Sequence, residues 1–168
     1  MRGASRAVLG EGLGRLLNHA PDWLVDNLPN YFGTRSGIDT NQQIALTTAI
    51  AMHYYHLDLY RLLSDPMIAA LNSQDQIAIG WGHDVSPQQR IGQWVIEAII
   101  RGHVGEDDPL RAEFYTRADP EARGDAIGHT AWTFLHAEMV DDIIRDRLAD
   151  LWDERVTHVR DHPEDKAE

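Results

Sequence analysis

The residues of this sequence best suited to chemistry are histidines placed near carboxylates. His53 and His56 lie three residues apart in an apolar stretch, and His83 is followed directly by Asp84. A neutral imidazole is a good ligand for a transition metal, and an adjacent carboxylate can bind the same ion. A metal lowers the pKa of its bound water to about 7 and so generates a hydroxide nucleophile. The pattern therefore favours a hydrolytic metal site.

Composition limits which other chemistries are open. The chain has no cysteine, which excludes disulfides, thiolate zinc sites, Fe–S clusters and thiol nucleophiles. The single lysine, Lys166, lies in the tail, so the folded part has neither a Schiff-base lysine nor a P-loop lysine. Any metal must be bound by His, Asp, Glu or backbone groups, and nine histidines are available.

The charge of the chain disfavours direct binding of nucleic acid. Its 15 Lys and Arg residues stand against 27 Asp and Glu residues, a net charge of −12, and the arginines form no cluster in the sequence. The phosphate backbone repels such a protein unless its basic residues gather on one face. No apolar run is long enough to span a membrane, and residues 1–17 make a poor signal peptide. We therefore expect a cytoplasmic protein with no membrane contact.

Apolar residues recur at helical spacing over almost the whole chain. We predict an all-α protein, a single compact domain of five to seven helices over residues 1–160, followed by a charged flexible tail at 161–168. The helices that bear on function are predicted over residues 40–63, 75–84, 86–103 and 127–159. Thr40 and Gln43 have the form of a capping box, and Ser86-Pro87 is typical of a helix start. His53 and His56 would then point about 60° apart on the apolar side of one helix.

Four stretches follow one another in an order that carries a family resemblance. They are Tyr55-His56-Leu57-Asp58, residues 77–85 with His83-Asp84, residues 95–103 ending in His103, and residues 134–139 with Glu138. This order resembles that of the HD-domain metal-dependent phosphohydrolases, which are all-helical, over about residues 50–142. The family closes its site with Asp, whereas this chain has Glu138 there, with Asp141 and Asp142 as alternatives.

The resemblance implies a metal centre and a substrate class. A divalent transition metal would be held by His56, His83, Asp84 and Glu138, with Asp84 also counted as catalytic. A metal-bound water would attack the phosphorus of a nucleotide or another small phosphoester. His53 could act as general acid, because an unperturbed histidine titrates near neutral pH. Either Arg35 or Arg90 could clamp the phosphate.

A structural role is the alternative for each of these residues. A histidine on the apolar face of a helix is most often a core residue with a backbone or carboxylate partner. Asp84 or Ser86 could simply cap the helix that follows. The acidic run from Asp141 to Glu154, interleaved with Arg145, Arg147 and Arg155, is typical of a solvated face with ion pairs along the helix.

A second function, from a different class, is also open. An acidic helical protein can act without catalysis, through protein–protein contacts, as an oligomeric structural or adaptor subunit, a regulator or an inhibitor. The net charge of −12 suits a basic partner, and a homo-oligomer is one form of this hypothesis. Trp81, Trp94, Trp132 and Trp152 would then be core or contact residues, and an exposed tryptophan in the last helix would favour an interface.

Overall fold

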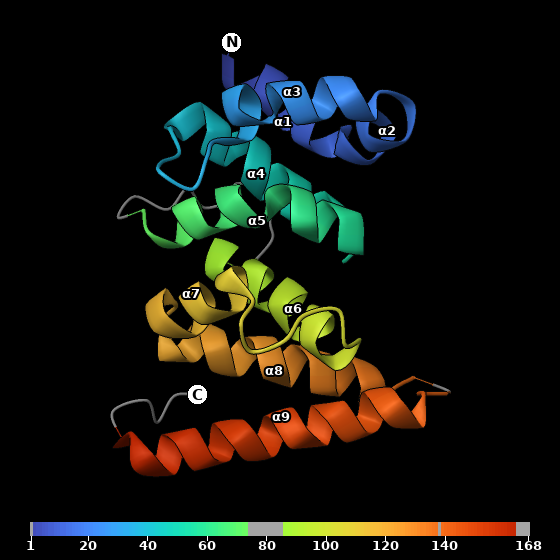
Figure 1. Ribbon diagram of the computed structural model, residues 1–168, viewed down its shortest axis with the longest axis vertical. Coiled ribbons are helices and arrows are strands. Elements are labelled where there is room, and N and C mark those ends of the chain that lie inside the picture. Colours follow the sequence, from blue (N-terminus) through green and yellow to red (C-terminus); the bar gives the residue numbers. More distant parts are fainter. Residues whose placement is uncertain (1, 74–85, 138, 164–168) are drawn as a thin grey trace. The chain divides into compact units, whose positions relative to one another are not determined.

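The computed structural model (Figure 1) describes residues 2–73, 86–137 and 139–163, and within these ranges it is all-α. The predicted fold class is confirmed, but the described residues form nine helices instead of five to seven. The number is higher because three stretches with helical periodicity are each divided. The breaks lie at residue 12, at residues 53–56, and at residues 136–137 and 139–141. The chain forms two compact units, residues 1–90 and 91–168.

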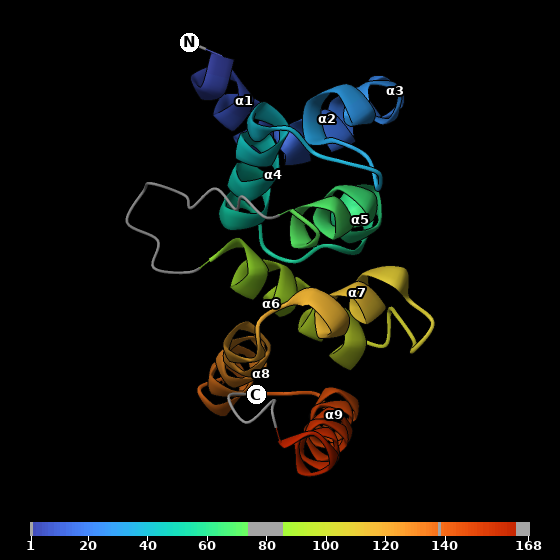
Figure 2. The same ribbon diagram turned by 90° about the vertical axis from the view of Figure 1, so that its left-hand side faces the viewer.

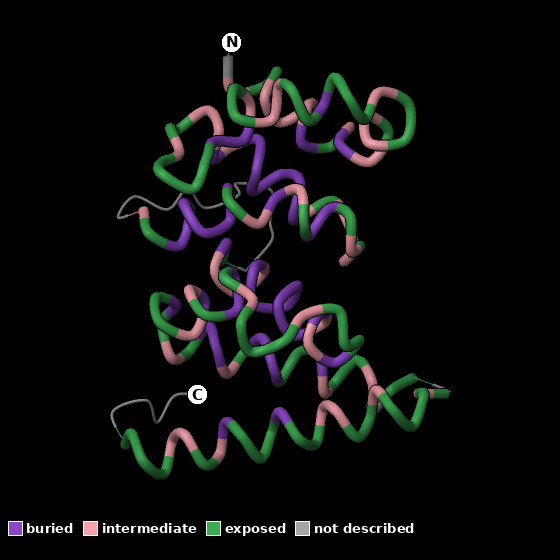
Figure 3. The backbone as a smooth tube through the Cα atoms, viewed as in Figure 1, coloured by how far each residue is buried: buried purple, intermediate pink, exposed green. Residues whose placement is uncertain are grey.

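The N-terminal unit is built around one almost completely buried helix. Its helices are α1 (Arg2–Glu11), α2 (Leu13–His19), α3 (Pro21–Phe32), α4 (Thr40–Met52) and α5 (Leu57–Leu71). Most of α4 is buried (Figure 3), and α1 packs closely against it. A Cβ atom added at Gly10 would lie 3.0 Å from Thr48 Cβ and would clash with the Ala45 carbonyl oxygen. Glycine is therefore required at this crossing of α1 and α4.

The starts of α4 and α6 show how far local signals determine helix boundaries. Asp39, not Thr40, caps α4: its Oδ1 accepts from Gln42 N at 2.8 Å, and its N–H donates to Gln42 Oε1 at 2.7 Å. This is a capping box one residue earlier than predicted. The start of α6 (Pro87–Ile100) is as predicted, because Ser86 Oγ accepts from Gln89 N at 3.2 Å.

The prediction of one continuous helix over residues 40–63 is wrong, because the structure has two helices there. The chain leaves the helix after Met52, and His53 is extended, with φ −111° and ψ 140°. A new helix, α5, begins at Leu57, with His56 as its N-cap. The cap side chain accepts a hydrogen bond from Asp58 N at 3.3 Å, which satisfies one of the free N–H groups at a helix start.

The C-terminal unit packs three shorter helices and one long helix around a second core. Its helices are α6, α7 (Pro109–Arg117), α8 (Pro120–Leu135) and α9 (Asp142–Asp161). The predicted helix over residues 127–159 is wrong as a single element, because α8 ends at Leu135 and Asp141 caps a separate α9. In Figure 1 and Figure 2 the two helices lie side by side. Within the ranges described above, every helix is too short or too polar to cross a bilayer.

Candidate functional site

The two histidines predicted to share a helix face lie on different elements. His53 ends α4, and its Nε2 donates a hydrogen bond to the Gly10 carbonyl oxygen at 3.3 Å. Its half-buried ring packs next to Gly14, where an added Cβ would lie 3.1 Å from His53 Cε1. His56 is exposed, and its Nδ1 accepts from Asp58 N at 3.3 Å. His53 therefore connects α4 to α1, while His56 caps α5.

The other predicted ligands cannot be placed. His83, Asp84 and Glu138, as well as Trp81 and the whole predicted helix over residues 75–84, lie outside the described residues. The metal site and the catalytic role of Asp84 therefore stay predictions. In residues 2–73, 86–137 and 139–163, no three histidine or acidic side chains come together in a way that could hold a metal ion.

The two alternative closing residues, Asp141 and Asp142, have local partners. Asp141 is the N-cap of α9, and its Oδ1 accepts from Ile143 N at 2.8 Å. Asp142 forms an ion pair with Arg145 on the same exposed face of α9. Both carboxylates therefore stabilise the start of this helix.

The two arginines considered as phosphate clamps differ in environment. Arg35 is exposed in a tight turn, in which Thr34 and Gly37 exchange backbone hydrogen bonds of 3.0 Å. These two N–H groups already have a partner within the turn. Arg90 is half-buried, and burial lowers the pKa of its guanidinium, an effect that Tyr54 opposes. Because arginine has so high an intrinsic pKa, Arg90 keeps its charge at neutral pH.

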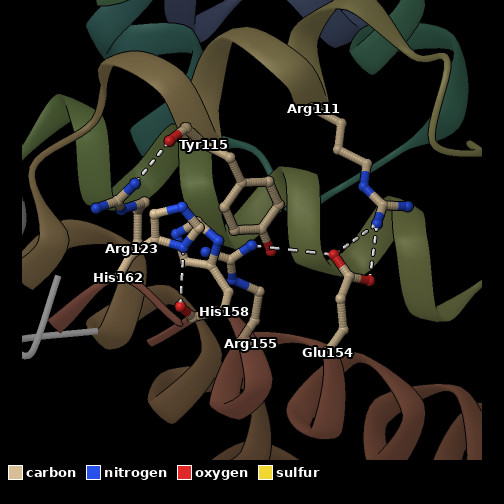
Figure 4. Close-up of polar contacts among 7 residues, drawn as sticks. All are labelled: Arg111, Tyr115, Arg123, Glu154, Arg155, His158 and His162. Carbon is tan, nitrogen blue, oxygen red and sulfur yellow. Dashed lines mark hydrogen bonds and ion pairs between the residues drawn. The ribbon is translucent and has the colours of Figure 1, made fainter. Parts of the chain in front are cut away.

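Long-range contacts of arginines join α7, α8 and α9 (Figure 4), and the sequence did not predict them. Arg111, Arg123 and Arg155 are buried in this unit. Arg111 donates two hydrogen bonds to the Glu154 carboxylate, at 3.0 and 3.1 Å. Arg155 approaches the same carboxylate at 3.9 Å and lies over the Tyr115 ring, 4.2 Å from its centroid. We call these five residues the arginine cluster.

The arginine cluster corrects the interpretation of the acidic run in the last helix. Arg145 is exposed and paired with Asp142, as predicted for a solvated face. Arg155 instead turns inward, and Arg147 donates to the Ile100 carbonyl oxygen at 3.4 Å. One signal in the sequence indicates this position: Arg155 lies four residues after the apolar Leu151, and residues four apart share a helix face. In the structure Leu151 is buried, so this face of α9 points inward.

An apolar pocket opens beside the arginine cluster. Its volume is about 190 Å³, and the described residues that line it are one of α8 and five of α9: Ile127, Trp152, Arg155, Val156, Val159 and Arg160. At the C-terminal end of α9, the ring of the C-cap residue His162 stacks on the His158 ring with centroids 4.3 Å apart, and His162 Nδ1 donates to the His158 carbonyl oxygen at 3.1 Å. The pocket thus combines an apolar wall with guanidinium groups.

Three exposed apolar residues lie in or next to the connection between α8 and α9 along the chain. Trp132 is 61% exposed, Met139 91% and Ile143 58%. His136 is exposed at the end of α8 and packs on the Trp132 ring, with centroids 4.4 Å apart. We call these four residues the corner patch. Trp152, farther along α9, is also exposed, whereas Trp94 is in the core.

Comparison with protein-family models, with curated proteins and with solved structures finds no match to this chain. The function must therefore be argued from the residues themselves.

Proposed function

We propose that this protein acts by binding another protein through the corner patch. The observation that carries the proposal is the exposure of Trp132, Met139 and Ile143, which all lie in the twelve-residue stretch 132–143 that contains the connection between α8 and α9. Single exposed apolar residues are normal on a protein surface, whereas a group of them indicates an interaction site. Tryptophan and methionine are also among the residues enriched in protein interfaces.

The charge around the corner patch specifies the kind of partner. Residues 91–168 hold 9 Lys and Arg against 19 Asp and Glu, a net charge of −10, while residues 1–90 hold 6 against 8. Asp141, Asp142 and Asp146 are exposed beside the patch. An acidic rim favours a partner whose apolar contact surface is surrounded by Lys and Arg, because complementary charges speed the encounter and select the partner.

The test compares an exposed position in the corner patch with an exposed position in the N-terminal unit. A photo-crosslinking amino acid is placed at Met139 in one variant and at Val25 of α3, 58% exposed, in another. We expect the first variant to capture a defined basic protein and the second to capture none of it. Ile143→Glu should abolish the capture, and added salt should weaken it. Equal capture at both positions would refute the proposal, as would a crosslink only to a second copy of this acidic chain.

The phosphohydrolase hypothesis has a separate test. Elemental analysis of untagged protein purified without chelator should find a stoichiometric transition metal if His56, His83, Asp84 and Glu138 form the predicted site. The His83→Ala/Asp84→Ala variant should then lose the metal, because each of these residues would be a direct ligand. An unchanged metal content in that variant would eliminate the site, and a retained thermal midpoint would show that the variant still folds.

A further inference from the structure

The pocket beside the arginine cluster has a lining whose charge is opposite to that of the unit around it. Among the lining residues that the structure describes, Arg155 and Arg160 are cationic and none is acidic. The other four are Ile127, Trp152, Val156 and Val159, which give an aliphatic and aromatic wall. Within a unit of net charge −10, this is a local site for an anion with an apolar body.

The two guanidinium groups have different roles. Arg155 is buried and held over the Tyr115 ring, so its position is fixed by the packing of α7 against α9. Arg160 is exposed at the pocket and forms no ion pair with any described residue. Its planar fork of N–H donors matches a carboxylate, with which arginine forms paired hydrogen bonds. Arg160 can therefore bind a carboxylate without breaking an existing ion pair in the described structure.

The size of the pocket limits the apolar part of the ligand. Its volume of about 190 Å³ is below the range of about 300–1,000 Å³ typical for drug-sized ligands. An apolar cavity of about 150 Å³ is large enough to hold benzene. One aromatic ring, or a short branched chain of similar bulk, therefore fits between Val156, Val159 and Ile127.

We propose that this pocket binds a small aryl or branched-chain carboxylic acid, whose apolar group lies against Val156 and Val159 and whose carboxylate pairs with Arg160. The proposal is independent of the corner patch, because it rests on other residues and on a free small molecule instead of a protein. Trp152 lines the same pocket, so its indole N–H provides a local signal for binding.

Phenylacetate is the probe, and phenylacetamide and phenethylamine are its neutral and cationic counterparts. We expect phenylacetate to shift the Trp152 indole N–H resonance in a saturable way, with a Kd on the order of 1 mM for a ligand of this size. The amide should bind at least about tenfold more weakly because it lacks the charge-assisted hydrogen bonds. The amine should not bind.

Two substitutions locate the site. Arg160→Gln should weaken phenylacetate binding about tenfold, whereas Arg145→Gln, an exposed arginine on the same helix, should leave it unchanged. Val156→Phe should abolish binding by filling the pocket. Thermal midpoints near that of the unmodified protein would show that each variant is folded.

Three results would overturn the proposal. The first is the absence of a saturable shift up to about 20 mM phenylacetate, a concentration well above the expected Kd. The second is equal binding of the acid and the amide, which would remove the role of charge. The third is a peptide ending in phenylalanine that binds far more tightly than phenylacetate, which would identify a protein terminus as the ligand instead of a free acid.

Discussion

Gly92 of α6 lies where α7 and α8 meet this helix, and its substitution by alanine tests the packing of the C-terminal unit. A Cβ atom at this position would lie 2.5 Å from Phe114 Cζ and 2.8 Å from Ala126 Cβ. Both neighbours are completely buried, so neither can move into solvent. We therefore predict that Gly92→Ala destabilises the protein, although alanine is the better helix former.

The magnitude follows from two opposing effects. Replacing glycine by alanine inside a helix is worth about 1 kcal/mol in favour of folding. Forcing an extra methyl group into a packed core costs about 1–3 kcal/mol, and contacts shorter than 3 Å place Gly92 at the upper end of that range. The net expectation is a loss of about 1–2 kcal/mol in the free energy of unfolding.

Gly128 of α8 provides the matched control. It is exposed within its helix, and an added Cβ would have no neighbour within 4 Å. Gly128→Ala should therefore keep the full gain of about 1 kcal/mol. Both substitutions remove the same glycine entropy from the unfolded chain, so their difference of about 2–3 kcal/mol isolates the steric cost at Gly92.

Urea unfolding followed by circular dichroism measures both changes. The midpoint should fall for Gly92→Ala and rise for Gly128→Ala, with the slope against urea unchanged. Phe114→Leu in the Gly92→Ala background should cost less than Phe114→Leu alone, because the smaller side chain relieves the clash. A Gly92→Ala protein as stable as the unsubstituted one would refute the packing of α6 against α7 and α8.

Three further predictions concern single contacts and use the same unfolding measurement. Glu154→Gln should lower the free energy of unfolding by about 2 kcal/mol, because the buried Arg111 loses its carboxylate partner. The partial exposure of Glu154 keeps the loss below that of a fully buried pair. An unchanged stability would show that the ion pair is not formed. Gly102→Ala should lower the free energy of unfolding by about 1–2 kcal/mol. The reason is that φ is 69° at this residue, in the Schellman motif that ends α6, and this left-handed conformation strains any residue with a Cβ atom. A stabilised variant would contradict that backbone conformation. Asp39→Ala should cost about 1 kcal/mol and Thr40→Ala much less; the reverse order would place the cap of α4 at the residue that the sequence first predicted.

The helix starts could be predicted from the sequence because their signals are local. Ser86-Pro87 and Asp108-Pro109 each place a capping side chain directly before a proline, and both helices begin at that proline. Asp119-Pro120 has the same form and α8 begins there, although the Asp119 side chain makes no capping hydrogen bond. These residues act within four positions of themselves, so no knowledge of the rest of the chain is needed.

The breaks after α4 and α8 could not be predicted because nothing in their sequence opposes a helix. Residues 53–56 read His-Tyr-Tyr-His, and residues 136–141 contain neither glycine nor proline. Apolar periodicity continues through both breaks, so two helices look like one. The Arg111–Glu154 ion pair was missed for a related reason, since its partners are 43 residues apart and only the fold brings them together.

The glycines near the N-terminus and the histidine after α4 explain each other. Taken separately, Gly10 and Gly14 weaken the helical pattern of their segment, and His53 is a candidate general acid. In the structure, the absence of a side chain at Gly10 lets α1 approach the Ala45 backbone, and the small Gly14 leaves space for the His53 ring. The Nε2–H group of His53 then donates a hydrogen bond to the Gly10 carbonyl oxygen. Because Nε2 already donates within the fold, a general-acid role for His53 would have to use the proton on Nδ1 of the imidazolium.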